Sequence, residues 1–155
     1  MRLSLWLVLP LLCLSTAQAD PVCVVSTKAI LRKGPGAKFP MSWTVTQNMP
    51  LMRVGPEKKG WLQVQDLDGE THWVAKRDVS SRYICTVVKS KSARLRKGPG
   101  TEHPVAELNS VDRYTPFRKI DRDGAWLLVQ DEYRARYWVH ETNVWLPSVR
   151  AKIRF

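Results

Sequence analysis

The feature of this sequence that most constrains its fold is an internal repeat. Residues 29–36 read Ala-Ile-Leu-Arg-Lys-Gly-Pro-Gly, and residues 93–100 repeat seven of these eight residues 64 positions later. Residues 61–66 (Trp-Leu-Gln-Val-Gln-Asp) return as residues 126–131 with one substitution, and a Trp-Val pair follows in both places. A motif set that returns once, in order, indicates duplication of a small domain, whereas a solenoid needs at least about three stacked units.

Each copy has the pattern of short β-strands separated by turns. In the first copy, residues 22–25 are apolar, residues 51–54 and 61–65 alternate, and residues 71–74 are short and aromatic. Glycine, proline and aspartate cluster between these runs, as they do in turns. About five short strands per copy cannot form two packed sheets, so the pattern predicts an all-β chain of two small closed barrels.

The N-terminus predicts export. Residues 3–14 form an apolar run, and residues 17–19 (Ala-Gln-Ala) give the small-x-small pattern of a signal-peptide cleavage site. We expect a cleaved signal peptide at residues 1–19 and a periplasmic or secreted mature chain. A lipid on Cys13 is disfavoured, because Leu12 precedes it where lipoprotein processing needs a small residue. No run reaches the roughly 18 apolar residues of a membrane helix, so we expect no transmembrane segment.

The ordered motifs resemble those of the bacterial SH3-like domain, in its periplasmic type. Leu-Arg-x-Gly-Pro-Gly, a later proline, Gly-Trp-x-x-Val and Asp-Gly-x-x-x-Trp-Val occur in the first copy, and the second copy follows closely. The sequence departs from the family at His72 and Tyr137, where a glycine usually precedes Trp-Val. The resemblance implies two tandem SH3-like β-barrels, at residues 20–83 and at residues 84–155 with a short C-terminal tail.

The resemblance also implies where a ligand would bind. The tryptophan of Gly-Trp-x-x-Val lies near the surface groove that eukaryotic relatives use for proline-rich peptides. Core or rim packing is the alternative role, and we expect at least one tryptophan of each matched pair in the core, because each ring can bury about 150–250 Å². With neighbouring loop residues, the ligand-binding candidates are Phe39, Trp43 and Trp61 in the first copy and His103, Tyr114 and Trp126 in the second.

Basic residues adjoin the repeated Gly-Pro-Gly turns. We expect the turn glycines, such as Gly34 and Gly36, to adopt positive φ beside the rigid proline. The adjoining cations are either solvated edge charges or a repeated basic contact. These candidates are Arg32, Lys33, Arg96 and Lys97.

We expect no catalytic site, no metal and no cofactor. The histidines (His72, His103 and His140) are scattered over both copies, and two of them adjoin strand tryptophans, as packed histidines do. The sequence has no Cys-x-x-Cys or His-x-x-x-His ligand spacing. A nucleophile would need a base and an orienting group within reach, and the sequence places none together.

The composition leaves two kinds of binding protein. With 25 basic and 14 acidic residues, the chain keeps a net charge of +10 after loss of the leader, which contains one arginine. The first hypothesis is a monomeric envelope module that recognises peptidoglycan or a protein peptide. The alternative is a polyanion binder of the nucleic-acid type, disfavoured by export, or a structural subunit of an envelope complex.

The two cysteines of the mature chain predict a disulfide. In the repeat alignment Cys23 matches Val87, so Cys23 and Cys85 are not one inherited core position. Cys23 lies in the opening strand of the first copy, and Cys85 lies just beyond the last strand of that copy. Because the first and last strands of an SH3-like barrel run side by side, the two Cα atoms would come within the 7 Å that a bridge requires. Two buried free thiols are the alternative, less expected in an exported chain.

Overall fold

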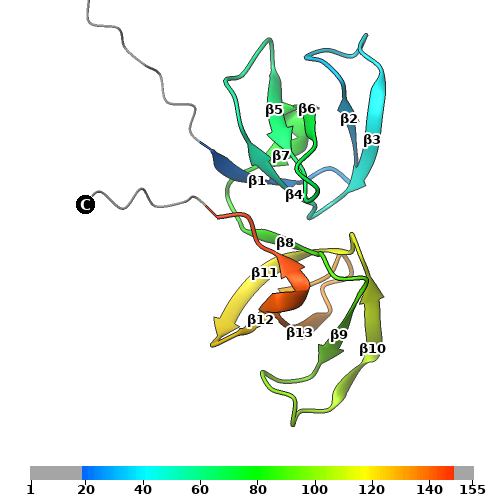
Figure 1. Cartoon of the computed structure of the whole chain (residues 1–155), viewed down its shortest axis with the longest axis vertical. Coiled ribbons are helices and arrows are strands. Elements are labelled where there is room, and N and C mark those ends of the chain that lie inside the picture. The colour runs from blue at the N-terminus through cyan, green and yellow to red at the C-terminus, as the bar shows by residue number, and fades with distance from the viewer. Residues whose placement is uncertain (1–18, 149–155) are drawn as a thin grey trace, which may run out of the picture.

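The computed structural model describes residues 19–148, which form two antiparallel β-sheets (Figure 1). The first sheet contains β1 (Asp20–Val24), β2 (Lys28–Arg32), β3 (Met41–Thr46), β4 (Pro50–Arg53), β5 (Trp61–Gln65), β6 (Thr71–Ala75) and β7 (Val79–Ser80). The second contains β8 (Cys85–Val88), β9 (Ser92–Arg96), β10 (Val105–Asp112), β11 (Pro116–Asp123), β12 (Trp126–Gln130), β13 (Arg136–His140) and β14 (Val144–Trp145). Short 3-10 helices, η1 (Lys76–Asp78) and η2 (Glu141–Asn143), precede the last strand of each sheet.

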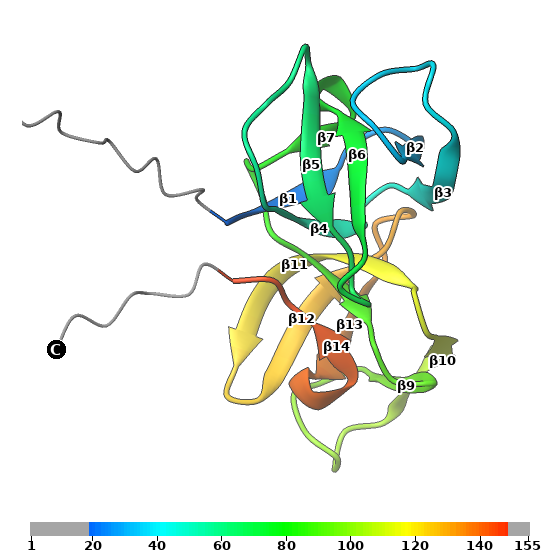
Figure 2. The same cartoon turned by 45° about the horizontal axis from the view of Figure 1, so that its top comes forward.

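The two sheets have the same topology. Their strand orders are β3-β2-β6-β5-β4-β1-β7 and β10-β9-β13-β12-β11-β8-β14, and each sheet curls around its own core (Figure 2). The prediction of an all-β chain with two SH3-like barrels is therefore confirmed. The expected signal peptide and the last residues of the C-terminal tail lie outside the described residues. None of the helices within residues 19–148 is long and apolar enough to cross a membrane.

Each sheet has seven strands, not the five that the sequence pattern suggested. The edge strand β3 occupies a stretch that we expected to be loop, because only one of its residues, Val45, is fully buried and its apolar alternation is weak. The two-residue strand β7 is too short for a periodic signal. β3 pairs with the preceding strand β2, whereas β7 pairs with β1, more than fifty residues away, which local pattern does not report.

The strand register agrees with the repeat. Cys23 on β1 pairs with Ser80 on β7, and Val87 on β8 pairs with Trp145 on β14, so Cys23 and Val87 are equivalent positions. Alternate residues of the strands fill two apolar cores. The first core contains Val22, Val24, Ala29, Leu31, Val45, Met49, Leu51, Leu62, Val64, Val74 and Val87, and the second contains Val88, Ala93, Leu95, Ala106, Phe117, Leu127, Val129, Val139 and Val144.

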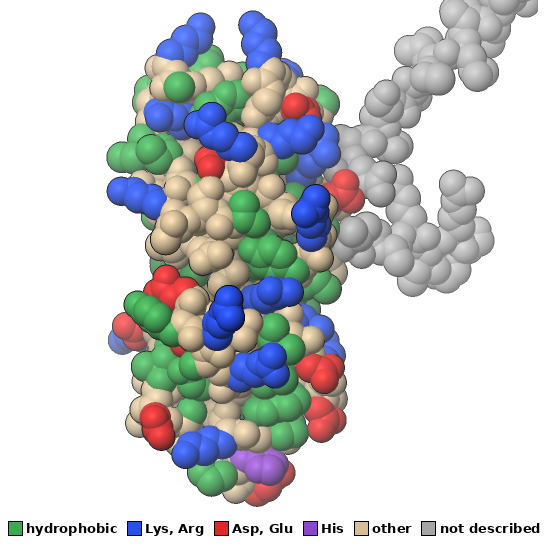
Figure 3. Space-filling view, turned by 180° about the vertical axis from the view of Figure 1, so that it is seen from behind, with side chains coloured by type: hydrophobic (Ala, Val, Ile, Leu, Met, Phe, Trp, Pro, Cys, Tyr) green, Lys and Arg blue, Asp and Glu red, His purple; other side chains and the backbone are tan. Residues whose placement is uncertain are grey.

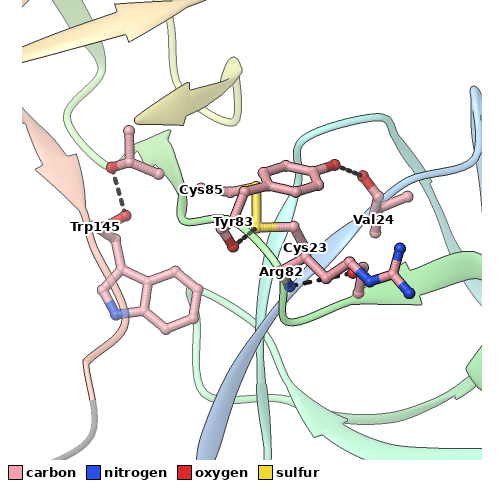
Figure 4. Close-up of a disulfide and its surroundings, with 8 residues drawn as sticks. Cys23, Val24, Arg82, Tyr83, Cys85 and Trp145 are labelled. Atoms are coloured by element: carbon pink, nitrogen blue, oxygen red, sulfur yellow. Dashed lines mark hydrogen bonds between the residues drawn. A yellow bond between two sulfur atoms is a disulfide. The ribbon is translucent and has the colours of Figure 1, made fainter. Parts of the chain in front are cut away.

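A disulfide joins the opening strands of the two barrels (Figure 4). It is the predicted pair, Cys23 and Cys85, with Cα atoms 5.7 Å apart and both residues 2% exposed. Because Cys85 lies on β8, the bridge crosses from one barrel to the other. The intervening Tyr83 is held by both sides: its hydroxyl donates to the Val24 carbonyl at 3.3 Å, and the Arg118 guanidinium lies 4.8 Å from its ring centroid.

The two barrels also meet through side chains. Val87, Tyr114 and Trp145 of the second barrel pack against the first core. Asp68, in the β5–β6 turn, accepts hydrogen bonds from Tyr114 Oη at 2.8 Å and Arg113 Nη2 at 2.7 Å. These two donors lower the pKa of the Asp68 carboxyl. We call this set of contacts the junction.

The disulfide should supply a large part of the stability. Replacing both cysteines, as C23A/C85A, should lower the free energy of unfolding by about 4 kcal/mol, because the bridge closes a loop of about 60 residues in the unfolded chain. Urea unfolding of the variant and of the oxidised and reduced wild type measures this. Two alkylated cysteines in the denatured, non-reduced mature protein would contradict the bridge.

The junction should make stability depend on acid pH. Since the folded-state pKa of Asp68 is lowered, its contribution is present above about pH 4 and is lost as the pH falls through the lower folded value. The effect is small, because the pair is partly exposed and screened by solvent. D68N should therefore melt below wild type at neutral pH, and the two midpoints should converge in acid. The exposed Glu132, changed to Gln, serves as control; a D68N midpoint equal to wild type at pH 7 would contradict this role.

Candidate functional site

The β5–β6 hairpin presents two tryptophans on the outer side of the first barrel. Leu62 and Val74 face each other in the core, so the alternate positions of the two strands face outward. Those positions hold Trp61 opposite Ala75 and, two residues along, Trp73 opposite Gln63. Lys58 lies 5.6 Å from the Trp73 ring centroid, a cation–π distance.

The second barrel presents the matching pair. Trp126 faces His140 on the outer side of the β12–β13 hairpin, and Trp138 faces Leu128. The Trp126 and His140 rings meet edge to face, 5.1 Å apart. Each barrel thus carries two tryptophans on the outward side of this hairpin, one at the end of the strand pair and one at its middle. We call this surface the outer aromatic face.

None of these four tryptophans belongs to either core cluster. The expectation that at least one of each pair is a core residue holds for the first pair, since Trp73 is buried with 9% exposure, although its ring lies on the side of the hairpin opposite Val74. It does not hold for the second pair, whose two rings are half-buried, as is that of Trp61. Smaller apolar side chains and one phenylalanine form the two core clusters.

The Gly-Pro-Gly loops have the same construction in both barrels. Arg32 Nη1 donates to the Phe39 carbonyl at 2.8 Å, and Arg96 Nη1 donates to the His103 carbonyl at 2.8 Å. The Phe39 ring covers Gly34, where an added Cβ would come within 2.3 Å of the ring. The arginines therefore close the loops, and Phe39 and His103 are loop-packing residues with partly exposed rings.

The first glycine of each loop, Gly34 or Gly98, is required for space and not for backbone conformation. Gly34 and Gly36 do not have the positive φ that we expected, since the positive-φ glycines of the described residues are Gly60, Gly69 and Gly124. At Gly98 an added Cβ would lie 2.4 Å from the His103 ring. A side chain at this position would displace the aromatic residue that covers the loop.

Of the four basic candidates, the lysines remain free to meet a partner. Lys33 and Lys97 are exposed at the loops, whereas Arg32 and Arg96 are half-buried in the hydrogen bonds described above. Lysine and arginine side chains are spread over both barrels on the face seen in Figure 3. The positive charge is therefore distributed and forms no single basic stripe on that face.

Two of the aromatic candidates lie in the junction. Trp43 packs against the first core and meets Tyr114 edge to face, with ring centroids 5.4 Å apart. Tyr114 is further held by its hydrogen bond to Asp68 and by Arg113, 4.9 Å above its ring. The structure thus brings together Trp43 and Tyr114 but separates them from Trp61 and Trp126, and we assign them to barrel-to-barrel packing.

The sequence reasoning missed a chain of polar side chains in the first barrel, in which His72 and Asp66 are buried and Ser42 is exposed. His72 Nε2 lies 2.9 Å from Asp66 Oδ2, and His72 Nδ1 lies 2.8 Å from Ser42 Oγ. Asp66 Oδ1 also accepts the backbone N–H groups of Asp68 and Glu70, both at 2.9 Å. The ligand atoms of Asp66, Glu70 and His72 lie within 4.8 Å of one another, a spacing that could hold a metal ion.

The equivalent residues of the second barrel indicate the role of these hydrogen-bonded side chains. Asp131, the counterpart of Asp66, accepts the backbone N–H groups of Tyr133 and Ala135, and Tyr137 donates to its other oxygen at 3.3 Å. Burial, followed by the nearby Asp131 carboxylate, raises the pKa of Tyr137. Since tyrosine replaces histidine here, the feature common to both copies is an aspartate that organises the hairpin turn. We interpret Ser42, His72 and Asp66 as a satisfied structural network.

Substitutions of the loop arginines should lower stability more than substitutions of the adjacent lysines. R32Q should lower the free energy of unfolding by about 1 to 2 kcal/mol, because it removes a charged hydrogen bond from the loop. K33Q, one residue away and exposed, should change stability by less than about 0.5 kcal/mol. Urea unfolding of both variants measures the difference, and equal effects would contradict the assignment of Arg32 to loop closure.

Comparison with known proteins relates the first barrel to a family. Residues 25–81 match the family profile described as the bacterial SH3 domain. The match covers the first copy and does not extend to the second, whose likeness rests on the repeat and the shared topology. No curated protein matches the chain.

Solved structures show only a distant likeness. NlpC1 from Trichomonas vaginalis has 12% identity and a TM-score of 0.38 over 84% of this chain and 46% of its own. An NlpC/P60 family protein from Bacillus cereus has 11% identity and a TM-score of 0.38, and the match covers 83% of this chain and 56% of that protein. The endolysin LysPBC5 CBD has 15% identity and a TM-score of 0.33, and the match covers 85% of this chain and 96% of that protein. The chain thus spans about half the length of the first two proteins, and these scores are too low to bear on function. The family relationship shown is that of residues 25–81 to the bacterial SH3 domain.

Proposed function

We propose that this protein is a non-catalytic binding module of the bacterial cell envelope that recognises peptidoglycan or a peptide of an envelope protein. We place the binding surfaces on two domains, residues 20–83 and 84–155, exported by the leader at residues 1–19. The family match of the first copy supports a binding domain of the bacterial SH3 type. The apolar leader supports a periplasmic or secreted location.

The outer aromatic face is the observation that carries this proposal. Trp61 and Trp126 are large, half-buried apolar side chains at equivalent positions outside the two core clusters. Tryptophans placed this way are typical anchors of binding surfaces. The exposed Lys33 and Lys97 would supply positive charge to the same barrels, which suits the carboxylates of the cell wall.

A non-catalytic role agrees with the polar groups of the fold. The one Ser–His–Asp chain found in the described residues has an aspartate occupied by the hairpin turn. In the second barrel Tyr137 takes the place of its histidine.

Binding to purified sacculi tests the proposal. The mature chain should co-sediment with sacculi at 50 mM salt and at 1 M salt, where the Debye length falls to about 3 Å. W61A and W126A should each weaken retention, and the double variant should weaken it by about tenfold or more, as loss of aromatic anchors does. Y133A is the matched control, since Tyr133 is 83% exposed and lies outside both faces.

The outcomes separate the two kinds of binding protein. Retention lost entirely at 1 M salt would indicate a general polyanion binder in place of the proposed module. Folded W61A/W126A protein, judged by its thermal midpoint, that binds like wild type would contradict the role of the outer aromatic face.

A further inference from the structure

A cleft of about 520 Å³ opens on the first barrel, apart from the outer aromatic face. It lies where β1, the end of β4 and the chain following β7 come together, and Glu57 and Lys76 also line it. Its volume falls in the range of small-ligand sites, about 300–1,000 Å³. None of the four outer tryptophans lines this cleft, so it is a separate candidate site.

The second copy has bulky side chains where the first leaves this space. By the strand register, Ser80 on β7 corresponds to Trp145 on β14, and the next residue, Ser81, corresponds to Leu146. Trp145 packs against the first core and Leu146 against the second. The second barrel thus uses the segment at its last strand for apolar packing, partly in the junction. In the first barrel two serines occupy the equivalent positions and leave the cleft open.

Cationic side chains converge on the cleft. Arg53, Lys76 and Arg82 line it, together with two carboxylates, those of Asp20 and Glu57. Lys76 is paired with Glu57 at 2.7 Å, and Arg53 uses its Nε to donate to the Gly55 carbonyl at 3.0 Å. Within residues 19–148, neither Arg53 nor Arg82 forms an ion pair with a carboxylate. Two guanidinium groups are therefore available, each with the fork geometry that matches a carboxylate.

Apolar side chains form the rest of the wall. Pro21, Val22, Leu62 and Val79 line the cleft beside the arginines. A bare inorganic anion would gain nothing from these groups, whereas small aliphatic side chains would bury apolar surface against them. The combination fits a short peptide with small apolar side chains and a carboxylate.

We propose that this cleft is a second binding site, which takes a short aliphatic peptide by its carboxylate. Arg53 and Arg82 bind the carboxylate, and the aliphatic wall receives the side chains. Ser81 keeps the entrance open. This inference does not depend on binding of sacculi by the outer aromatic face.

Amide NMR titration with acetyl-trialanine tests the site on the full mature chain. The free-acid peptide should shift the amides of Arg53, Leu62 and Ser81, and its C-terminal amide should bind about tenfold more weakly, because it lacks the charge. No shifts at millimolar free-acid peptide, or equal binding of the amide, would overturn the proposal. Inorganic phosphate that reproduces the same shifts with equal affinity would also overturn it, since it would indicate a simple anion site.

Variants then assign the residues. R53Q/R82Q should weaken the peptide by about tenfold or more, and S81L, which copies Leu146, should block it. R77Q is the matched control, because Arg77 lies on η1, is exposed and does not line the cleft. Folded R53Q/R82Q that binds like wild type would contradict the assignment. W61A/W126A should bind the peptide normally, so failure of this site and failure of the proposed function remain distinguishable.

Discussion

The contact between the opening strands of the two barrels is the constraint on which the rest of the molecule depends. Each barrel has only about 60 residues, a size at which a single core gives marginal stability. The Cys23–Cys85 bridge joins β1 to β8 beneath Tyr83, and Val87 completes the first core from the second barrel. The first core is therefore not finished by the first repeat alone. The tandem is one unit in which the second barrel completes the core of the first.

The two copies of one framework carry different surfaces. The features that both retain are those that close the loops and turns: Arg32 and Arg96 on a carbonyl, Asp66 and Asp131 on the hairpin turn. The differences lie where the barrels meet or face solvent. Ser80 and Ser81 leave a basic cleft open in the first copy, whereas Trp145 and Leu146 build apolar contacts in the second.

Local chemistry alone misassigned several aromatic residues. Trp43, alone in the repeat and near a loop, has the pattern of a contact residue, but the fold places it against Tyr114 across the junction. For Trp61 the sequence left both a groove role and a core role open, and the β5–β6 register places it on the side of the hairpin opposite the core. In each case, the role depends on which side of a strand faces the core and on which barrel lies opposite. The residue type alone does not distinguish these roles.

The duplication, the all-β class and the cysteine pair could be predicted from the sequence, because the repeat, the period of two and the two cysteines outside the expected leader are properties of the order of residues. Only the tertiary structure decided that the disulfide crosses between barrels, that β3 is a strand, and that Arg53, Lys76 and Arg82 line one cleft. Arg53 lies more than twenty positions before Lys76 and Arg82, and no local period links the three residues. Strand pairing over long sequence distances, together with the volume of each side chain at the junction, brings them together.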